Sequence, residues 1–180
     1  MLFRSRPGFL VPVIGLLKGL MDPIVGLSMG QTAENLATRF GITREQMDAY
    51  AVESHKRLFV ARESGFLGEI ESSYDSSGNF YEHDDGLRPD SSVEALAKLR
   101  PVFDRRFGNI TAGNSAQVTD GAAWVLLASE TAVEKYGLSP MAEIVDTQWA
   151  ALDPAEMGLG PVHAVIPMLS RHKQIGRAHV

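Results

Sequence analysis

Apolar residues recur at helical spacing in the first third of the chain. Residues 31–40 carry alanine, leucine and phenylalanine at intervals of three and four, which predicts a helix ending at Gly41. Thr43 and Gln46 have the spacing of a capping box, so a second helix is predicted to begin there and to stop at Gly65. Its inward face is expected to be the set at helical spacing: Met47, Tyr50, Ala51, Ser54, Leu58 and Ala61.

The pattern then becomes irregular. Residues 68–90 predict a loop and hairpin, with a turn at 76–79 and a short strand at Phe80 and Tyr81. A second capping box, Ser91 to Glu94, predicts a helix that runs through Leu99 and stops at Pro101.

The second half predicts buried strands between short helices. The continuous apolar run 122–128 is typical of a strand covered on both faces, and 142–146 has the pattern of another. Ser129 is expected to cap a helix ending at Gly137. Asp153-Pro154 predicts a brief helical turn, and Pro161 the start of a last helix that Pro167 should kink. Its inward face is predicted to be Val162, Val165, Ile166 and Leu169. The order of these elements predicts an α/β fold built in layers.

Composition narrows the function classes. The 180 residues are 44% hydrophobic and 22% charged, as in globular proteins, and suggest one domain or one domain with part of another. A net charge of -5 gives no indication of the basic surface that nucleic-acid-binding proteins carry. The chain has no cysteine, which excludes a disulfide, a thiolate metal site and a cysteine nucleophile within it. The adjacent Asp84 and Asp85 have no third ligand at suitable spacing, so no metal site is expected.

The N-terminal segment has two interpretations. Arg4 and Arg6 precede an apolar run, which is the order found in a signal peptide. Pro12, Lys18 and Asp22 interrupt that run, so it is too short to span a membrane. We expect a buried or partner-facing segment, with the signal peptide as the alternative.

The best candidate for chemistry, judged from residue types alone, is Gly113-Asn114-Ser115. Small residues let a ligand approach the backbone closely, and the polar side chains offer hydrogen bonds. No phosphate-loop, dinucleotide or serine-nucleophile pattern is present around it, so a purely structural turn is an equal alternative. His163 is a weak candidate base, with a packed histidine as the commoner explanation, and His55 is given no catalytic role.

Four segments in order resemble the thiolase family. They are 28–37 (SMGQTAENLA) with the helix start 43–51, then 96–103 (LAKLRPVF), 111–123 (TAGNSAQVTDGAA) and 157–164 (MGLGPVHA). The similarity extends over about residues 10–172 and is strongest to bacterial 3-ketoacyl-CoA thiolases of fatty-acid oxidation. It implies a partial thiolase-like layered fold.

The resemblance implies an acyl transfer. In thiolases a cysteine thiolate attacks the 3-keto thioester, acetyl-CoA leaves, and CoA, as co-substrate, takes the acyl group from the enzyme. The family's nucleophile lies before the SMG segment, and its NEAF, GHP and CxGxG motifs follow the GP motif. None of these is present, so we expect an internal fragment that is inactive alone, with no catalytic residue, metal or permanently bound cofactor.

The same resemblance implies contacts with CoA. Met29 matches a methionine of the pantetheine and acyl tunnel, Arg88 an arginine near the nucleotide, and Phe103 an aromatic residue beside adenine. Ala112 and Ser115 match the loop that passes the pantetheine. Ala116 replaces a serine that hydrogen bonds to pantetheine in many members, so that contact depends on Ser115.

The resemblance to thiolases also implies how the chain is divided into parts and what it associates with. Residues 1–116 are expected to be the lid or loop domain, 117–137 the last strand and helix of the N-terminal half, and 138–174 the start of the C-terminal half. Residues 175–180 resemble an artefactual tail. A cytoplasmic homo-oligomer is expected, with a hydratase–dehydrogenase subunit as a candidate partner and membrane contact left open. The alternatives are a stand-alone binding module and a fragment of a biosynthetic acetoacetyl-CoA thiolase, which Ser28 disfavours because that branch has histidine there.

Overall fold

The computed structural model describes residues 15–173, so the expectations for residues 1–14 and 174–180 lie outside it. The described chain forms two compact units. The first runs to Gln117 and includes Pro154–Gly158, and the second comprises Val118–Asp153 and the residues from Leu159 onward.

The first unit is built on two capped helices. After the short helix α1 (Gly15–Gly19), α2 (Met29–Phe40) begins at a capping box in which the Ser28 side chain accepts from the Gln31 amide, and it ends at left-handed Gly41. The predicted helix over 31–40 is therefore confirmed, two residues longer at its start. The second predicted helix is α3 (Arg44–Glu63), and Thr43 and Gln46 form its expected capping box.

The buried face of α3 differs from the prediction. Asp48 and Val52 are its buried residues, whereas Tyr50 is 80% exposed and Ser54 is also exposed. The buried face differs because α3 packs against the rest of the unit through a polar side chain, Asp48. Hydrogen bonds across the unit satisfy the buried Asp48 carboxylate. The buried face of α3 is therefore centred on Asp48 and Val52, and the spacing of apolar residues alone predicts a different face.

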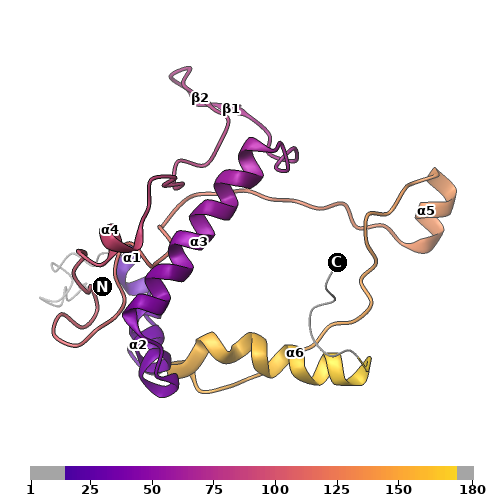
Figure 1. The fold of residues 1–180 in the computed structure, drawn as a ribbon. Coiled ribbons are helices and arrows are strands. Elements are labelled where there is room, and N and C mark those ends of the chain that lie inside the picture. The colour runs from indigo at the N-terminus through magenta and orange to yellow at the C-terminus, as the bar shows by residue number, and fades with distance from the viewer. Residues whose placement is uncertain (1–14, 174–180) are drawn as a thin grey trace, which may run out of the picture. The chain divides into compact units, whose positions relative to one another are not determined.

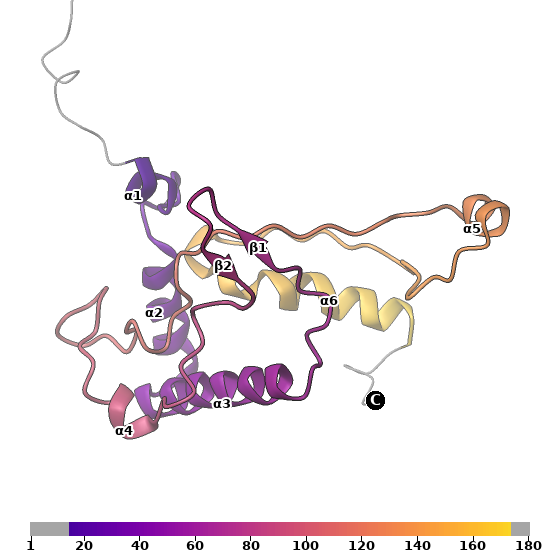
Figure 2. The same cartoon turned by 90° about the horizontal axis from the view of Figure 1, so that it is seen from above.

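A hairpin and a one-turn helix complete the first unit. Strands β1 (Ser73–Tyr74) and β2 (Phe80–Tyr81) pair antiparallel, as the turn signal predicted. Helix α4 (Val93–Leu96) is shorter than expected and is capped by Ser92 rather than Ser91, since the Ser92 side chain accepts from the Ala95 amide. In Figures 1 and 2, α4 lies beside the first half of α3.

The core of the first unit is small and partly polar. The 3-10 helix η2 (Pro154–Leu159) reaches α2 through two contacts: the Asn35 side chain donates to the Ala155 carbonyl at 3.2 Å, and Arg39 pairs with Glu156. Its start at Pro154 matches the predicted turn. The buried residues of the described chain all belong to this unit: Thr32, Ala37, Asp48, Val52, Leu87, Leu96, Ile110 and Thr111.

The second unit lacks the predicted strands. Residues 122–128 and 142–146 form no strand, and Trp124, at 96% exposure, and Leu126, at 86%, have no core around them. The prediction of strands there is wrong for this structure, because a strand needs hydrogen-bonding neighbours and residues 15–173 supply none to these segments.

The helices of the second unit follow their local signals. Helix α5 (Glu130–Tyr136) is capped by Ser129 and ends at left-handed Gly137, both as predicted. Helix α6 (Gly160–Arg171) has Pro161 in its first turn and continues past Pro167. Of its predicted inward face, Val162, Val165 and Ile166 are exposed. Between residues 15 and 173, none of the helices combines the length and the hydropathy required to cross a bilayer.

Candidate functional site

Two of the predicted contact residues lie at the N-terminus of α2: Met29 begins the helix and Phe103 packs on the residue after it. Met29 is the first residue of α2 and its side chain is 53% exposed. The Phe103 ring lies directly on Gly30, since a Cβ atom placed on Gly30 would fall 1.9 Å from the Phe103 Cε2 atom. Only glycine allows this approach, so Gly30 lets the aromatic ring pack on the first turn of α2, one residue after Met29.

An open hollow lies beside Phe103. It is lined by Phe103 and its neighbours Asp104 and Arg105, together with residues of the α2 start such as Gln31 and Glu34. Asp104 is fixed there, because the amides of Arg106 and Phe107 donate to its Oδ1 at 2.9 and 3.1 Å. These backbone hydrogen bonds hold the pKa of Asp104 below its usual range.

Residues 108–117, here called the 108–117 loop, are organised around the Asn114 side chain. Its Oδ1 accepts from the Thr111 amide at 2.8 Å, and its Nδ2 donates to the Asn109 carbonyl at 2.9 Å and to Asp48 Oδ1 at 3.0 Å. The Ser115 hydroxyl donates to the Thr111 carbonyl at 2.7 Å. Thr111 is completely buried, while Ala112 and Ala116 face outward. The loop is thus a fixed turn that exposes small residues.

Two carboxylates from the two long helices hold this loop. From α2, Glu34 accepts from the Asn109 and Ile110 amides, each at 2.9 Å. From α3, Asp48 accepts from Asn114 through one oxygen and from Arg44 Nε, at 2.7 Å, through the other. The loop position is therefore set by α2 and α3 together.

Space around the loop is limited. A Cβ on Gly113 would lie 2.4 Å from Leu96 Cδ2 and 2.6 Å from Leu99 Cδ1, and one on Gly108 would lie 2.4 Å from the Asp104 carbonyl oxygen. Both glycines are therefore required by close packing. The glycine of the predicted Gly113-Asn114-Ser115 loop serves this packing.

Arg88 occupies a separate loop that α3 also supports. Its amide donates to His55 Nδ1 at 3.2 Å, and its guanidinium donates to the carbonyls of Asp85, at 2.6 Å, and Leu87, at 3.0 Å. The Gln117 side chain donates to the Gly86 carbonyl at 3.0 Å, which joins this loop to the end of the 108–117 loop.

The structure brings some predicted contact residues together. Phe103 packs on Gly30, the residue after Met29, and Ala112, Ser115 and Ala116 share one loop. Arg88 lies apart from them: its guanidinium donates within its own segment, its amide donates to His55 of α3, and its loop meets the 108–117 loop through the Gln117–Gly86 hydrogen bond. The Ser115 hydroxyl hydrogen is used internally, so Ser115 offers an incoming group only its oxygen as an acceptor in this conformation.

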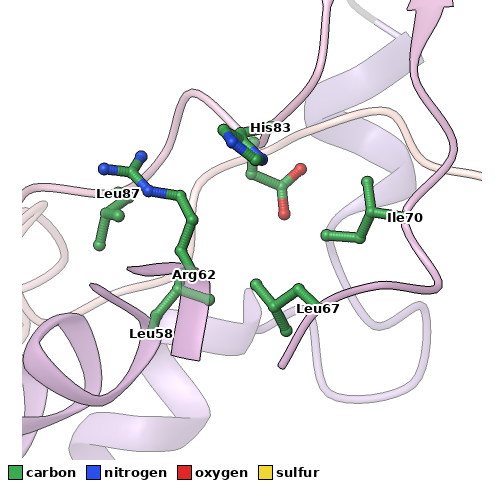
Figure 3. Close-up of a pocket in the computed structure, with 7 residues that line it drawn as sticks. Leu58, Arg62, Leu67, Ile70, His83 and Leu87 are labelled. Carbon is green, nitrogen blue, oxygen red and sulfur yellow. The ribbon is translucent and has the colours of Figure 1, made fainter. Parts of the chain in front are cut away.

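A second, smaller hollow lies at the far end of α3 (Figure 3). Leu58, Leu67, Ile70 and Leu87 give it an apolar floor, with Arg62 and His83 at its rim. None of the residues predicted to contact CoA lines it.

The described part of the second unit contains a polar cluster around Asp146 and the candidate base His163. Asp146 Oδ2 accepts from Arg171 Nε at 3.0 Å and lies 2.7 Å from His172 Nε2. The hydrogen bonds from Arg171, and then those from His172, lower the pKa of Asp146 to about 2. His163 is exposed on α6, which gives no support to a catalytic role.

Sequence reasoning missed the residues that hold the site. Asp48, Glu34 and Arg44 make hydrogen bonds to partners more than fifty residues away, so no local spacing identifies them. The sequence showed Asp48 only as an acidic residue beside the apolar stripe of α3, which does not reveal its burial or its partners.

Comparison with known proteins identifies the family. A family model described as the thiolase N-terminal domain matches residues 12–131. The chain belongs to the thiolase family. The predicted fold class is confirmed at the level of the family fold, because solved thiolase structures match this chain closely.

Two curated relatives are named 3-ketoacyl-CoA thiolase. The mitochondrial protein of Rattus norvegicus is 41% identical over 157 residues, which are 85% of this chain and 39% of that protein. The protein of the bacterium Saccharophagus degradans is 44% identical over 142 residues, which are 76% of this chain and 36% of that protein. The chain thus spans less than two fifths of the length of these relatives.

Solved structures agree in fold. Human mitochondrial 3-ketoacyl-CoA thiolase in complex with CoA matches with a TM-score of 0.83 and 39% identity, over 88% of this chain and 40% of that one. The dimeric peroxisomal thiolase of Saccharomyces cerevisiae matches with a TM-score of 0.78 and 34% identity, over 82% of this chain and 38% of that one.

Proposed function

We propose that this chain carries the CoA-facing part of a 3-ketoacyl-CoA thiolase of fatty-acid oxidation. The whole enzyme cleaves a 3-ketoacyl-CoA with CoA to give acetyl-CoA and a shortened acyl-CoA. In this proposal Met29, Phe103 and the exposed side of the 108–117 loop contact CoA, and the chain supplies no residue that forms or breaks the bonds.

The observation that carries the proposal is the packing of Phe103 on Gly30. It sets an exposed aromatic ring against the first turn of α2, which begins with the exposed Met29, and the ring lines an open hollow. An aromatic face suits stacking of an adenine ring, and a thioether suits a flexible pantetheine arm. The CoA complex of the human relative, which aligns over 88% of this chain, supports CoA as the ligand.

The chemistry requires a group that this chain lacks. Thiolysis needs a nucleophile that attacks the 3-keto carbonyl, carries the acyl group and then leaves, and a cysteine thiolate does all three. The 180 residues contain no cysteine. The purified chain is therefore expected to bind CoA without turning over a 3-ketoacyl-CoA.

The predicted partners remain part of the proposal. A homo-oligomeric whole enzyme is supported by the dimeric yeast relative. The cytoplasmic location and the hydratase–dehydrogenase partner are predictions made from the sequence resemblance.

CoA binding tests the proposal directly. Isothermal titration of the purified chain with CoA is expected to give saturable binding that Phe103→Ala weakens. Phe107→Ala is the matched control, because Phe107 is in the same segment and is 76% exposed. Equal loss in both variants, or thiolysis by the unchanged chain, would contradict the proposal.

A further inference from the structure

The Asp48 carboxylate is the most buried charged group of the described residues that makes long-range hydrogen bonds. Its side chain is 1% exposed, and it lies in the first turns of α3. Its two oxygens have different partners: Oδ1 accepts from Asn114 Nδ2 at 3.0 Å and Oδ2 accepts from Arg44 Nε at 2.7 Å. Burial of a carboxylate without partners is costly, so both contacts are required for it to stay inside.

The contact with Asp48 fixes which way the Asn114 amide faces. Both hydrogens of its Nδ2 are used, by Asp48 and by the Asn109 carbonyl, and its oxygen receives the Thr111 amide. A rotated amide would set its NH2 group against the Thr111 N–H, donor against donor. Asp48 therefore selects the one orientation that closes the turn from Asn109 to Asn114.

Arg44 links the same carboxylate to α4. Its guanidinium NH2 group donates to the carbonyls of Leu96 and, at 3.2 Å, Leu99. Leu96 and Leu99 are also the residues against which Gly113 packs. The 108–117 loop is thus held from two sides, by hydrogen bonds to Asp48 and by contact with the segment that Arg44 anchors.

We propose that Asp48 is a positioning residue for CoA binding: through Asn114 it holds Ala112, Ser115 and Ala116 where the pantetheine arm passes, without touching CoA itself. This inference rests on the proposed function, which puts the exposed side of the 108–117 loop next to pantetheine. In this inference Asp48, a buried acidic residue of α3, contributes to the affinity for CoA.

The variant Asp48→Asn tests the inference. Asparagine offers one acceptor where two donors point, so either Arg44 or Asn114 loses its partner and faces an NH2 group instead. We expect the Kd for CoA to rise about tenfold, the size expected when one buried donor is left unpaired. The matched control is Glu53→Gln, which removes the exposed Glu53–Arg57 ion pair from the same helix and should change the Kd by less than about twofold.

A second ligand separates positioning from general damage to the fold. Adenosine 3′,5′-bisphosphate has the nucleotide end of CoA but no pantetheine, so its affinity should be the same in Asp48→Asn and in the unchanged chain. An equal loss for both ligands, or an unchanged CoA affinity in Asp48→Asn, would overturn the inference.

A residue exchange provides a rescue. Asn114→Asp sets two carboxylates against each other and is expected to weaken CoA binding more than Asp48→Asn does. In the double variant Asp48→Asn with Asn114→Asp, the new amide can donate to the new carboxylate and still accept from Arg44. The hydrogen bond to the Asn109 carbonyl stays lost in both variants, so the expected recovery is partial. Recovery of CoA affinity relative to Asn114→Asp supports the inference, and no recovery contradicts it.

Amide hydrogen exchange distinguishes failure of this inference from failure of the proposed function. If the unchanged chain binds no CoA, the proposed function is refuted. The Thr111 amide, which donates to Asn114, still reports on the loop. Faster exchange of that amide in Asp48→Asn supports the role of Asp48 in holding the loop, and unchanged exchange overturns it.

Discussion

The Phe103 ring occupies the space that a side chain on Gly30 would need. A Cβ atom on Gly30 would be 1.9 Å from Phe103 Cε2 and 2.2 Å from Cζ, far inside van der Waals contact. Gly30 is in the first turn of α2, where glycine is otherwise unfavourable, so its presence there is explained by the ring. This contact determines where the one aromatic residue of the proposed CoA site lies.

Gly30→Ala is expected to destabilise the first unit by about 1–3 kcal/mol, the usual cost of overpacking. The helix propensity of alanine acts in the opposite direction and is smaller. Urea unfolding followed by circular dichroism measures the loss. The control is Gly68→Ala, where the nearest atom to a new Cβ is the Gly65 carbonyl oxygen at 3.8 Å.

A double-mutant cycle tests whether collision with the Phe103 ring causes the destabilisation by Gly30→Ala. In the presence of Phe103→Ala, the same Gly30→Ala change should cost much less, because the ring it collides with is gone. If Gly30→Ala costs the same with and without the Phe103 ring, the contact is not the reason for the glycine.

The Asp146 carboxyl is expected to titrate well below an ordinary aspartate. Its hydrogen bonds with Arg171 and His172 lower its pKa from 3.8 to about 2. Because the folded-state pKa is the lower one, this contribution to stability is present above about pH 4 and is lost as the pH falls towards 2. Carboxyl carbon shifts followed against pH in NMR spectra measure the pKa directly.

The pKa of Asp146 should return towards 3.8 in Arg171→Ala. Arg105→Ala, an exposed arginine of the other unit, serves as the control and should leave the pKa of Asp146 unchanged. Titration of Asp146 near 3.8 in the unchanged chain would show that the cluster does not form in solution.

The apolar run 122–128 is expected to make the purified chain self-associate. Trp124, Val125, Leu126 and Leu127 are each at least 73% exposed, and a contiguous apolar segment without strand partners pairs readily with other chains. Sedimentation velocity should show association that increases with concentration and that Leu126→Lys reduces. Tyr50→Lys, at an isolated residue that is 80% exposed, is the control and should not reduce it. A monomer at all concentrations would contradict this prediction.

Local signals predicted the helices well and the strands poorly. Thr43 with Gln46 caps α3, and Ser129 caps α5 through the Ala132 amide, each within one turn of chain, so the residues that decide a helix start are close in sequence. A strand over 122–128 depends on hydrogen bonds to other segments, which an apolar pattern does not reveal. The hairpin is the exception, because its turn brings the two strands together locally.

Of the candidate site, the sequence predicted only the residues that match family motifs. Met29 and Phe103 were identified by resemblance, and the structure adds that they are neighbours through Gly30. The contact between Asp48 and Asn114 joins residues 66 positions apart, so no spacing rule connects them. The inward face of α3 was misplaced for the same reason, since its central residue is an acid rather than an apolar side chain.

The most direct test of the central claim is to map CoA onto this chain by NMR. We expect CoA to shift, saturably and with one Kd, the Met29 methyl group, the Phe103 ring and the amides of residues 112–116. The residues around the smaller hollow at Leu58 and His83 should not shift. Saturable shifts confined to that hollow, or no saturable shift at all, would contradict the account that this chain forms the CoA-facing part of a thiolase.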